Sequence, residues 1–234
     1  MTNQFSRTEL LIGESGMQKL ASSHVAVFGV GGVGGYVVEA LVRCGVGYID
    51  IIDNDKVHIT NLNRQIIALQ STIDEYKVDV AEKRILDINP ACIVKKFKTF
   101  FTPETSSEFD FSKYDYVIDA IDTVSGKIEL VVKCNEFGTP IISSMGAGNK
   151  MHPEMFEISD IYKTSVCPLA KAMRQELKKR GIKKLKVVYS KEIPVKSQLI
   201  QDGKTIPASN SFVPSAVGLI IAGEVVRNLI NYAS

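Results

Sequence analysis

The stretch from residue 25 to residue 53 constrains the fold more than any other part of the chain. A short apolar run at 25–28 leads into a glycine-rich loop, a helical segment follows, and a second apolar run at 48–52 ends at Asp53. A glycine loop between a strand and a helix lets the backbone approach a phosphate, which the helix N-terminus attracts. An acid about 20 positions further on can accept hydrogen bonds from ribose hydroxyls. Glycines can also serve a tight turn alone, but that explanation leaves Asp53 without a role, so we expect a bound nucleotide.

Each glycine of the loop has a separate task in this interpretation. Gly29 permits the turn away from the strand, and Gly31 lets the backbone come close to a phosphate. Gly32 begins a helix whose N-terminus points at the anion, and Gly34 lets that helix lie close to the sheet. These four glycines and Asp53 are the first candidate nucleotide-binding residues.

The composition indicates an ordinary folded protein. The 234 residues are 45% apolar, which is ample for the core of one elaborated domain, and the net charge of +2 gives no general bias toward nucleic acid. The four cysteines form no CxxC pair, which argues against a structural zinc site. The N-terminus lacks an apolar signal segment, and the apolar run at 212–226 contains Pro214 and Glu224. We therefore expect a cytoplasmic protein without a stable membrane span, in which this run forms a terminal helix packed on the sheet.

Strand-like and helical segments alternate along the first half of the chain. This rhythm predicts an α/β fold, namely a Rossmann-like, doubly wound and mostly parallel sheet. The second half is less regular and predicts a C-terminal elaboration of mixed strands and helices. We expect a single domain over 1–234, with a nucleotide-binding core at 7–150 and a substrate-binding elaboration at 151–234. The expected strands are 25–28, 48–52, 91–97, 116–119, 140–144 and 186–189, and the expected helices are 8–20, 32–43, 77–89, 125–137, 167–180 and 212–226.

Three further positions carry chemistry suited to a triphosphate. Arg64, in Asn-Leu-Asn-Arg-Gln at 61–65, offers a planar fork for phosphate oxygens, although it could be a surface arginine. Lys77 opens a helix from which it could reach phosphates, and its alternative is an exposed lysine. Asp122 follows a strand end, where open α/β sheets bind ligands, and could hold Mg²⁺ between phosphates or cap the next helix.

Together these residues indicate adenylation rather than hydride transfer. A nicotinamide-dependent oxidoreductase would explain the loop and Asp53 but would leave Arg64, Lys77 and Asp122 idle. With ATP on the loop, a substrate carboxylate could attack the α-phosphate. That attack needs no catalytic base, because a carboxylate is already ionised near neutral pH. A non-catalytic nucleotide-sensing or RNA-binding module is a further alternative.

The motifs resemble the ATP site of the ubiquitin-activating-enzyme-like superfamily. The resemblance is carried by the glycine loop, Asp-Asn-Asp at 53–55, the 61–65 motif, Lys77 and Ala-Ile-Asp at 120–122. It implies ATP contacts from Asp55, Asn61 and Gln65 in addition to the residues above. It also implies a homodimer in which Arg7 reaches the ATP site of the neighbouring subunit. The catalytic set implied in this way is Arg7, Arg64, Lys77 and Asp122.

The second half looks like one branch of that superfamily, the tRNA threonylcarbamoyladenosine dehydratases. The similarity lies in Ser-Met-Gly-Ala-Gly-Asn-Lys-Met-His-Pro at 144–153 and in shorter matches at 160–164, 168–171, 187–190 and 211–219. It implies ATP-dependent cyclisation of the threonylcarbamoyl group on the adenosine beside the anticodon. The threonyl carboxylate would be adenylated, and an internal nitrogen or oxygen would then displace AMP with net loss of water.

The alternative function is an adenylyltransferase that activates a ubiquitin-like sulphur-carrier protein. Such enzymes often bind zinc through two CxxC pairs, which this chain lacks. Cys167 stands near the position of the thioester cysteine in ubiquitin-type activators. It is either a nucleophile, if its pKa is lowered, or an incidental cysteine ahead of a helix. A Na⁺ or K⁺ site and a cysteine desulfurase with its sulphur acceptor are expectations from the superfamily alone.

A basic cluster in the second half is a candidate tRNA-binding surface. A local patch on a nearly neutral protein suits a phosphate backbone, and such binding should weaken with salt. Its alternative is a solvated, lysine-rich helix. Tyr162 and Tyr189 could stack on an exposed base, or they could pack in the core. The cluster consists of Lys171, Arg174, Lys178, Lys179, Arg180, Lys183 and Lys184.

Overall fold

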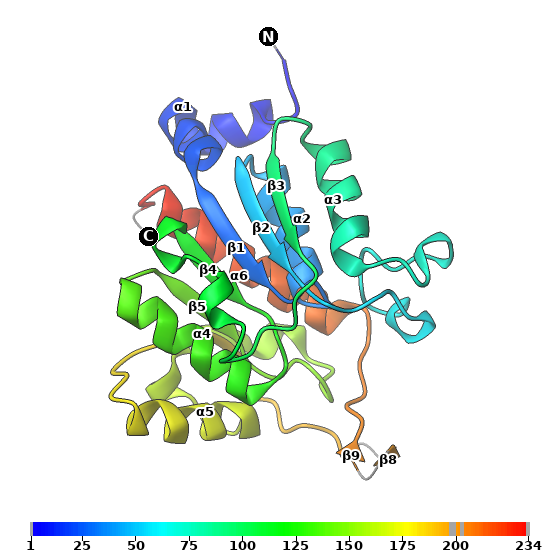
Figure 1. The fold of residues 1–234 in the computed structure, drawn as a ribbon, viewed down its shortest axis with the longest axis vertical. Coiled ribbons are helices and arrows are strands. Elements are labelled where there is room, and N and C mark those ends of the chain that lie inside the picture. The colour runs from blue at the N-terminus through cyan, green and yellow to red at the C-terminus, as the bar shows by residue number, and fades with distance from the viewer. Residues whose placement is uncertain (1, 197–199, 202–203, 233–234) are drawn as a thin grey trace.

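Seven strands form one sheet through both halves of the chain (Figure 1). The computed structural model describes residues 2–196, 200–201 and 204–232. The spatial order is β3-β2-β1-β4-β5-β7-β6, and every neighbouring pair is parallel except β6 and β7. The strands are β1 (His24–Phe28), β2 (Tyr48–Ile52), β3 (Ile93–Phe97), β4 (Tyr116–Asp119), β5 (Ile141–Ser144), β6 (Phe156–Asp160) and β7 (Lys186–Ser190). The predicted doubly wound, mostly parallel α/β fold is confirmed.

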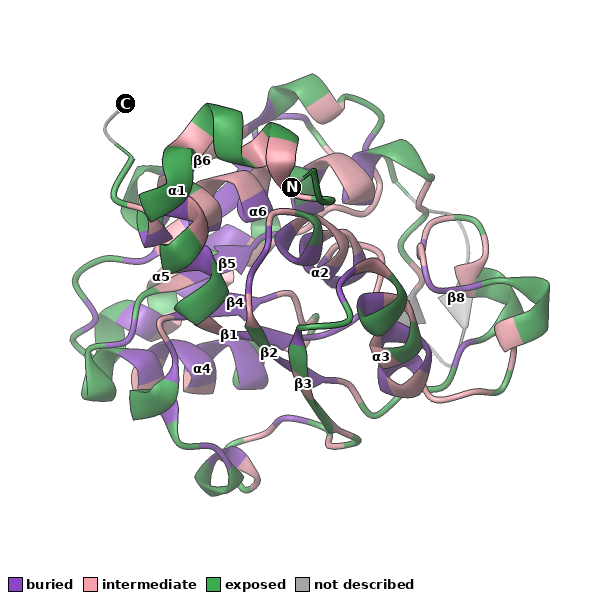
Figure 2. Cartoon of the chain, turned by 90° about the horizontal axis from the view of Figure 1, so that it is seen from above, coloured by how far each residue is buried: buried purple, intermediate pink, exposed green. Residues whose placement is uncertain are grey.

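Helices cover both faces of this sheet. Residues Val25 and Val27 of β1 point to a core shared with α2, α3 and α6. Ala26 and Phe28 point to the opposite face, where a layer of phenylalanines and α4 covers them. Figure 2 shows the central strands almost entirely buried between these layers. The helices are α1 (Ser6–Ser22), α2 (Gly34–Arg43), α3 (Lys77–Ile88), α4 (Val124–Phe137), α5 (Pro168–Lys179) and α6 (Phe212–Leu229).

The predicted elements are all present, with some shifted boundaries. The helix expected from residue 32 begins at Gly34, because residues 32 and 33 still belong to the turn. The first helix is longer than expected and is kinked at Gly13, where φ is +75°. The segment 150–160, read as mixed, supplies the antiparallel edge strand β6. The connection between β7 and α6 is largely irregular in its described part. It contains the short strands β8 (Ile200–Gln201) and β9 (Lys204–Thr205), while residues 197–199 and 202–203 lie outside the described part.

The terminal helix α6 has the length and apolar composition of a membrane-crossing helix. In the folded chain, 44% of this helix is buried, and Val213, Val217 and Ile221 belong to the core beneath the sheet. Its main neighbour is α2, which the ribbon shows behind the sheet in the same layer (Figure 1). The packing is that of a terminal core helix, as expected from Pro214 and Glu224 in its sequence.

A fully buried ion pair ties α4 to the sheet. The Lys127 ammonium lies 3.0 Å from an oxygen of Asp119 and donates to the Ser144 carbonyl at 2.7 Å and to the Ser143 hydroxyl at 3.4 Å. That hydroxyl donates to the other carboxylate oxygen of Asp119. Lys127 is 1% exposed and Asp119 0%. All three ammonium hydrogens are therefore used, and the cluster joins α4 to the carboxyl ends of β4 and β5.

We expect Lys127→Met to reduce the free energy of unfolding by about 3–5 kcal/mol, because it leaves the Asp119 carboxylate buried without a countercharge. The double variant Lys127→Met with Asp119→Asn removes that charge and should lose less stability than the single variant. Urea unfolding of the three proteins measures the difference. A double variant as unstable as the single one, or less stable, would contradict this account.

Candidate nucleotide-binding site

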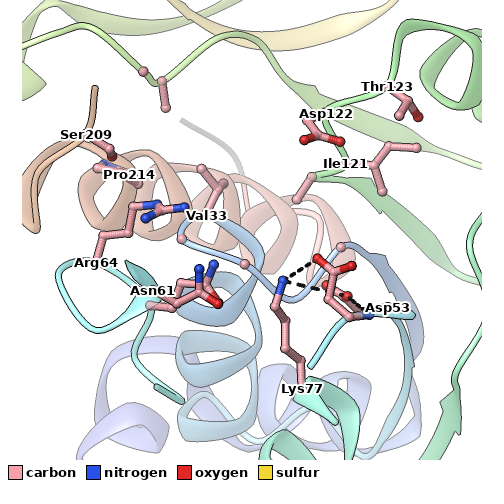
Figure 3. A pocket seen from close by; sticks show the side chains of 18 of the residues that line it. Val33, Asp53, Asn61, Arg64, Lys77, Ile121, Asp122, Thr123, Ser209 and Pro214 are labelled. Atoms are coloured by element: carbon pink, nitrogen blue, oxygen red, sulfur yellow. Dashed lines mark hydrogen bonds and ion pairs between the residues drawn. The ribbon is translucent and has the colours of Figure 1, made fainter. Parts of the chain in front are cut away.

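A cavity of about 690 Å³ opens at the carboxyl ends of β1, β2 and β4 (Figure 3). The chain leaves β1 toward β2 on one side and later returns to β4 on the other, so the crevice lies at the point where the strand order reverses. Open α/β sheets bind ligands at this point. The cavity is lined by the glycine loop, the residues after β2 and β3, the loop after β4, and parts of the second half of the chain.

The glycine loop brings three backbone segments into close contact. Gly29 has φ +90°, a conformation that glycine adopts without strain, and a side chain there would lie 2.7 Å from the carbonyl oxygen of Ala120. A Cβ atom on Gly34 would lie only 1.7 Å from the Gly29 carbonyl oxygen. The tasks assigned to these two glycines thus have a direct steric basis. Gly31 and Gly32 line the cavity itself.

Asp53 and Lys77 face each other across the floor of the cavity (Figure 3). The Asp53 carboxylate accepts hydrogen bonds from the backbone amides of Val30 at 2.8 Å and Asp55 at 2.9 Å. Burial raises the pKa of Asp53, and the Lys77 ammonium, 3.9 Å away, opposes that rise. Lys77 is 5% exposed and donates to the Asp55 carboxylate at 2.7 Å. Asp53 is therefore held in one orientation, and Lys77 is held between two acids at the cavity.

The 61–65 motif forms another wall of the cavity. Asn61 accepts a hydrogen bond from the His58 amide at 3.0 Å. Arg64 donates to the Thr60 carbonyl at 3.1 Å, and partial burial lowers its pKa. Gln65 is 6% exposed, and its side-chain oxygen is buried without a hydrogen-bond partner among the residues that the structure describes. A buried acceptor without a donor fits a cavity that receives a ligand with polar hydrogens.

Asp122 is exposed on the loop after β4 and also lines the cavity. Nowhere in the described part of the chain do three or more histidine, cysteine or acidic side chains gather into a metal cluster. Mg²⁺ in nucleotide sites is usually held by one or two carboxylates together with phosphates and water. The donor set therefore fits a metal ion carried by a nucleotide rather than one enclosed by protein ligands.

Arg7 lies outside this cavity. It is exposed on α1, two residues after Phe5, whose ring would lie 3.6 Å from a side chain on Gly45. Gly45 is in the turn that leads into β2, so this end of α1 is at the opposite edge of the sheet from the cavity. Leu10 and Leu11, on the same helix, are 89% and 78% exposed. Arg7 is thus separate from the site of its own chain.

Several residues of the cavity were missed in the sequence. Thr99, Phe100 and Phe101 follow β3, and Ile206 to Ser209 return from the long connection after β7. Neither segment has a periodic pattern or a motif that could identify it. Ala147 and Gly148 also line the cavity, and they lie in the 144–153 stretch that carried the family resemblance.

Only some side chains of the basic cluster are bonded to other described residues. Arg174 donates to Thr164, and Lys179 and Arg180 pair with Glu176 at 2.6 and 2.8 Å. The remaining members are exposed and form no ion pair with any described residue: Lys171, Lys178, Lys183 and Lys184.

The candidates Tyr162, Tyr189 and Cys167 differ in their exposure to solvent. Tyr189 is 1% exposed in the core beside α5, which confirms the packing alternative and excludes stacking on a base, whereas Tyr162 is 36% exposed. The inward position of Tyr189 follows from the alternation along β7. Cys167 is 2% exposed in the same core, just ahead of α5.

Comparisons with known proteins identify the family. A model of the ThiF family matches residues 5–234. The chain belongs to the ThiF family. It is 48% identical to the tRNA threonylcarbamoyladenosine dehydratase of Bacillus subtilis over 98% of this chain and 96% of that protein. It is 41% identical to the Escherichia coli protein of the same name over 75% of this chain and 65% of that protein.

A solved structure of this family has the same fold. The crystal structure of E. coli tRNA N6-threonylcarbamoyladenosine dehydratase, TcdA, in complex with ATP matches with a TM-score of 0.90 and 34% identity, covering 97% of this chain and 94% of that one. With the B. subtilis relative, this places the chain in the dehydratase branch of the ThiF family, as the sequence motifs predicted.

Two glycines of the loop should respond differently to alanine. Gly34→Ala forces a methyl group into the Gly29 carbonyl and should lower the free energy of unfolding by about 1–3 kcal/mol or more. At Gly31 the nearest atom to a new methyl is 3.7 Å away, so Gly31→Ala should keep stability within about 1 kcal/mol and weaken ATP binding. Urea unfolding and calorimetric titration with ATP measure both effects. Equal stability of the two variants would refute the assigned contact.

Proposed function

We propose that this protein is an ATP-dependent enzyme that cyclises threonylcarbamoyladenosine beside the tRNA anticodon by adenylating its threonyl carboxylate. The observation that carries the proposal is the full-length likeness to the dehydratases, in a chain whose phosphate-binding motifs converge on one cavity. The family name supplies the substrate, and the cavity supplies groups suited to the chemistry.

The residues of the cavity would divide the work of adenylation. The ribose of ATP would bind to Asp53, which two backbone amides hold in place. The phosphates would lie along the glycine loop, where the α2 N-terminus, Arg64 and Lys77 offset their charge. Incoming phosphates would compete with the Asp55 carboxylate for the Lys77 ammonium. Mg²⁺ held by Asp122 would supply further charge neutralisation to the phosphates.

The reaction would then proceed in two displacements. A threonyl carboxylate oxygen attacks the α-phosphorus of ATP, and the bond to pyrophosphate breaks. A carbamoyl nitrogen or oxygen next attacks the activated acyl carbon, AMP leaves with the former carboxylate oxygen, and one proton is released. The nucleoside loses one water, and ATP becomes AMP and pyrophosphate. Positioning and charge stabilisation supply the catalysis, as in phosphoryl transfer.

Activation of a sulphur-carrier protein is the less favoured alternative. Enzymes of that branch often carry two CxxC pairs for zinc, and this sequence has none. A thioester mechanism needs an accessible thiol, whereas Cys167 is buried. Ring closure within one molecule requires no enzyme thioester.

Other partners follow from the proposal. The four exposed lysines of the basic cluster would contact tRNA phosphates, in a salt-sensitive manner. A cytoplasmic location would follow from a tRNA substrate. Mg²⁺, a Na⁺ or K⁺ site, and a cysteine desulfurase with its sulphur acceptor stay predictions from the superfamily.

The direct test uses Mg·ATP and tRNA that bears threonylcarbamoyladenosine, followed by digestion and mass analysis of the nucleosides. We expect loss of one water from that nucleoside only when ATP is present. Asp122→Ala should lower the rate by about 100-fold or more, because a charged contact to the phosphates is lost. Asp87→Ala, an exposed acid on α3 outside the cavity, is the matched control and should keep full activity. An unchanged nucleoside despite confirmed ATP binding would favour the sulphur-carrier alternative.

We also propose that the enzyme is a homodimer in which each Arg7 completes the site of the other subunit. The position of Arg7 at the far edge of its own sheet supports this arrangement, as do the exposed Leu10 and Leu11 beside it.

Mixing two inactive variants tests the exchange of Arg7. Arg7→Ala and Asp122→Ala should each be inactive alone. After subunit exchange at equal concentrations, half of the dimers are mixed and each has one intact site, so about a quarter of the wild-type activity should return. No recovery, with mixed dimers verified by native mass spectrometry, would show that Arg7 does not act across the interface.

A further inference from the structure

The connection between β7 and α6 returns to the cavity as one of its walls. Residues 206–209 line the cavity, and residue 210 leads into the N-terminus of α6. We call residues 206–210 the wall segment. It has no helix or strand of its own and lies outside the main sheet. Its position over the cavity must therefore come from bonds to other segments.

Asn149 provides two of those bonds, both to Ala208. Its backbone amide donates to the Ala208 carbonyl at 2.7 Å, and its side-chain oxygen accepts from the Ala208 amide at 2.7 Å. Its own carbonyl accepts from the amide of Val195 at 2.8 Å. One residue thus holds both the outgoing limb of the connection, at 195, and the returning limb, at 208.

The conformation of Asn149 explains why asparagine suits this position. Its φ is +60°, in the left-handed region that most side chains avoid and that asparagine tolerates better than most. This conformation lets the backbone amide and the side-chain oxygen of Asn149 bond the carbonyl and amide of one residue, Ala208.

Two more asparagines fasten the same segment. The Asn63 side chain, from the adjacent 61–65 motif, donates to the Ser209 carbonyl at 3.1 Å. The Asn210 side chain donates to the Lys150 carbonyl at 2.9 Å and accepts from the Val213 amide at 2.8 Å. The wall segment is therefore attached to the 61–65 motif, to residues 149–150 and to the start of α6.

The wall segment stands at the end of the cavity away from Asp53. Ser209 lies beside Arg64 and Pro214 in Figure 3, while Asp53 and Lys77 lie across the cavity. The ribose is expected at Asp53, so the wall segment borders the region where the phosphates meet the group that attacks them. A displaced wall should disturb the acyl substrate more than the nucleoside.

We propose that Asn149 is a positioning residue that acts through the wall segment to hold the threonylcarbamoyl group of the tRNA against the phosphates of ATP. This inference rests on the proposed function. It assigns substrate positioning to the hydrogen-bonded clasp that Asn149 forms with Asn63 and Asn210, of which only Asn63 lies in a nucleotide motif.

The test compares two substitutions at one position. Asn149→Gly keeps the left-handed backbone and the two backbone bonds but removes the acceptor for the Ala208 amide. Asn149→Asp keeps that acceptor. We expect the KM for tRNA to rise about fivefold or more in Asn149→Gly, the effect of one lost hydrogen bond, with kcat and the KM for ATP unchanged. Asn149→Asp should behave like the wild type.

A second perturbation acts on the wall segment without removing a bond. A methyl group on Gly148 would lie 2.9 Å from the Pro207 Cβ, so Gly148→Ala should push the segment away and raise the KM for tRNA in the same manner. Hydrogen exchange at the Ala208 amide reports whether the clasp has opened, and it should be faster in Asn149→Gly than in Asn149→Asp.

The outcomes separate positioning from a structural role. An unchanged KM for tRNA in Asn149→Gly, although Ala208 exchanges faster, would overturn the proposal. A lower kcat, higher KM values for both tRNA and ATP, and a lower Tm would together also overturn it, because these changes indicate general destabilisation. If the wild type converts no tRNA, the proposed function itself fails. The clasp is then judged by tRNA binding on filters, where weaker binding by Asn149→Gly than by Asn149→Asp supports it and equal binding overturns it.

Discussion

The site depends on a backbone contact in which no side chain can take part. Gly34 approaches the Gly29 carbonyl so closely that a single Cβ atom would overlap it, and Gly29 in turn lies against Ala120. These contacts bring the end of β1, the start of α2 and the loop after β4 into one crevice. An anion at that point meets helix amides on one side and Asp122 on the other. The buried Lys127–Asp119 pair continues the same packing below, because Asp119 is the residue before Ala120.

Acidic and basic side chains at the cavity offset one another's charge within the protein itself. Lys77 is nearly buried, and a buried ammonium is unfavourable unless paired. Asp53 and Asp55 provide that pairing, and Asp53 is itself kept in place by two backbone amides. Asp53, which suits a ribose, and Lys77, which suits a phosphate, are thus neighbours because the buried ammonium needs a carboxylate beside it. A nucleotide can engage both groups without first moving a charge out of the core.

Sequence reasoning succeeded where local patterns decide the structure. The strands β2 and β4 match the expected bounds, because each is a short, largely apolar run that is buried on both faces apart from Tyr48 at the start of β2. The glycine loop, Asn61, Arg64, Gln65, Lys77 and Asp122 line one cavity, which opens where parallel strands end at the same edge of the sheet. The residues at 99–101 and 206–209 could not be foreseen, because their placement depends on contacts such as Asn149 to Ala208 that join distant segments. The sequence left two alternatives for Tyr189, because it does not show that both faces of β7 are covered; in the folded chain Val188, Tyr189 and Ser190 are all buried.

The two ends of the cavity are therefore built by different means. The nucleotide end consists of loops anchored in the sheet, where glycine contacts and a buried ion pair leave little freedom. The other end is a segment held from outside the main sheet by the amides of three asparagines. Hydrogen bonds at partly exposed positions open more readily than a packed core. The division also explains why the nucleotide end follows a short motif that sequence reveals, whereas the substrate end becomes visible only in the folded chain.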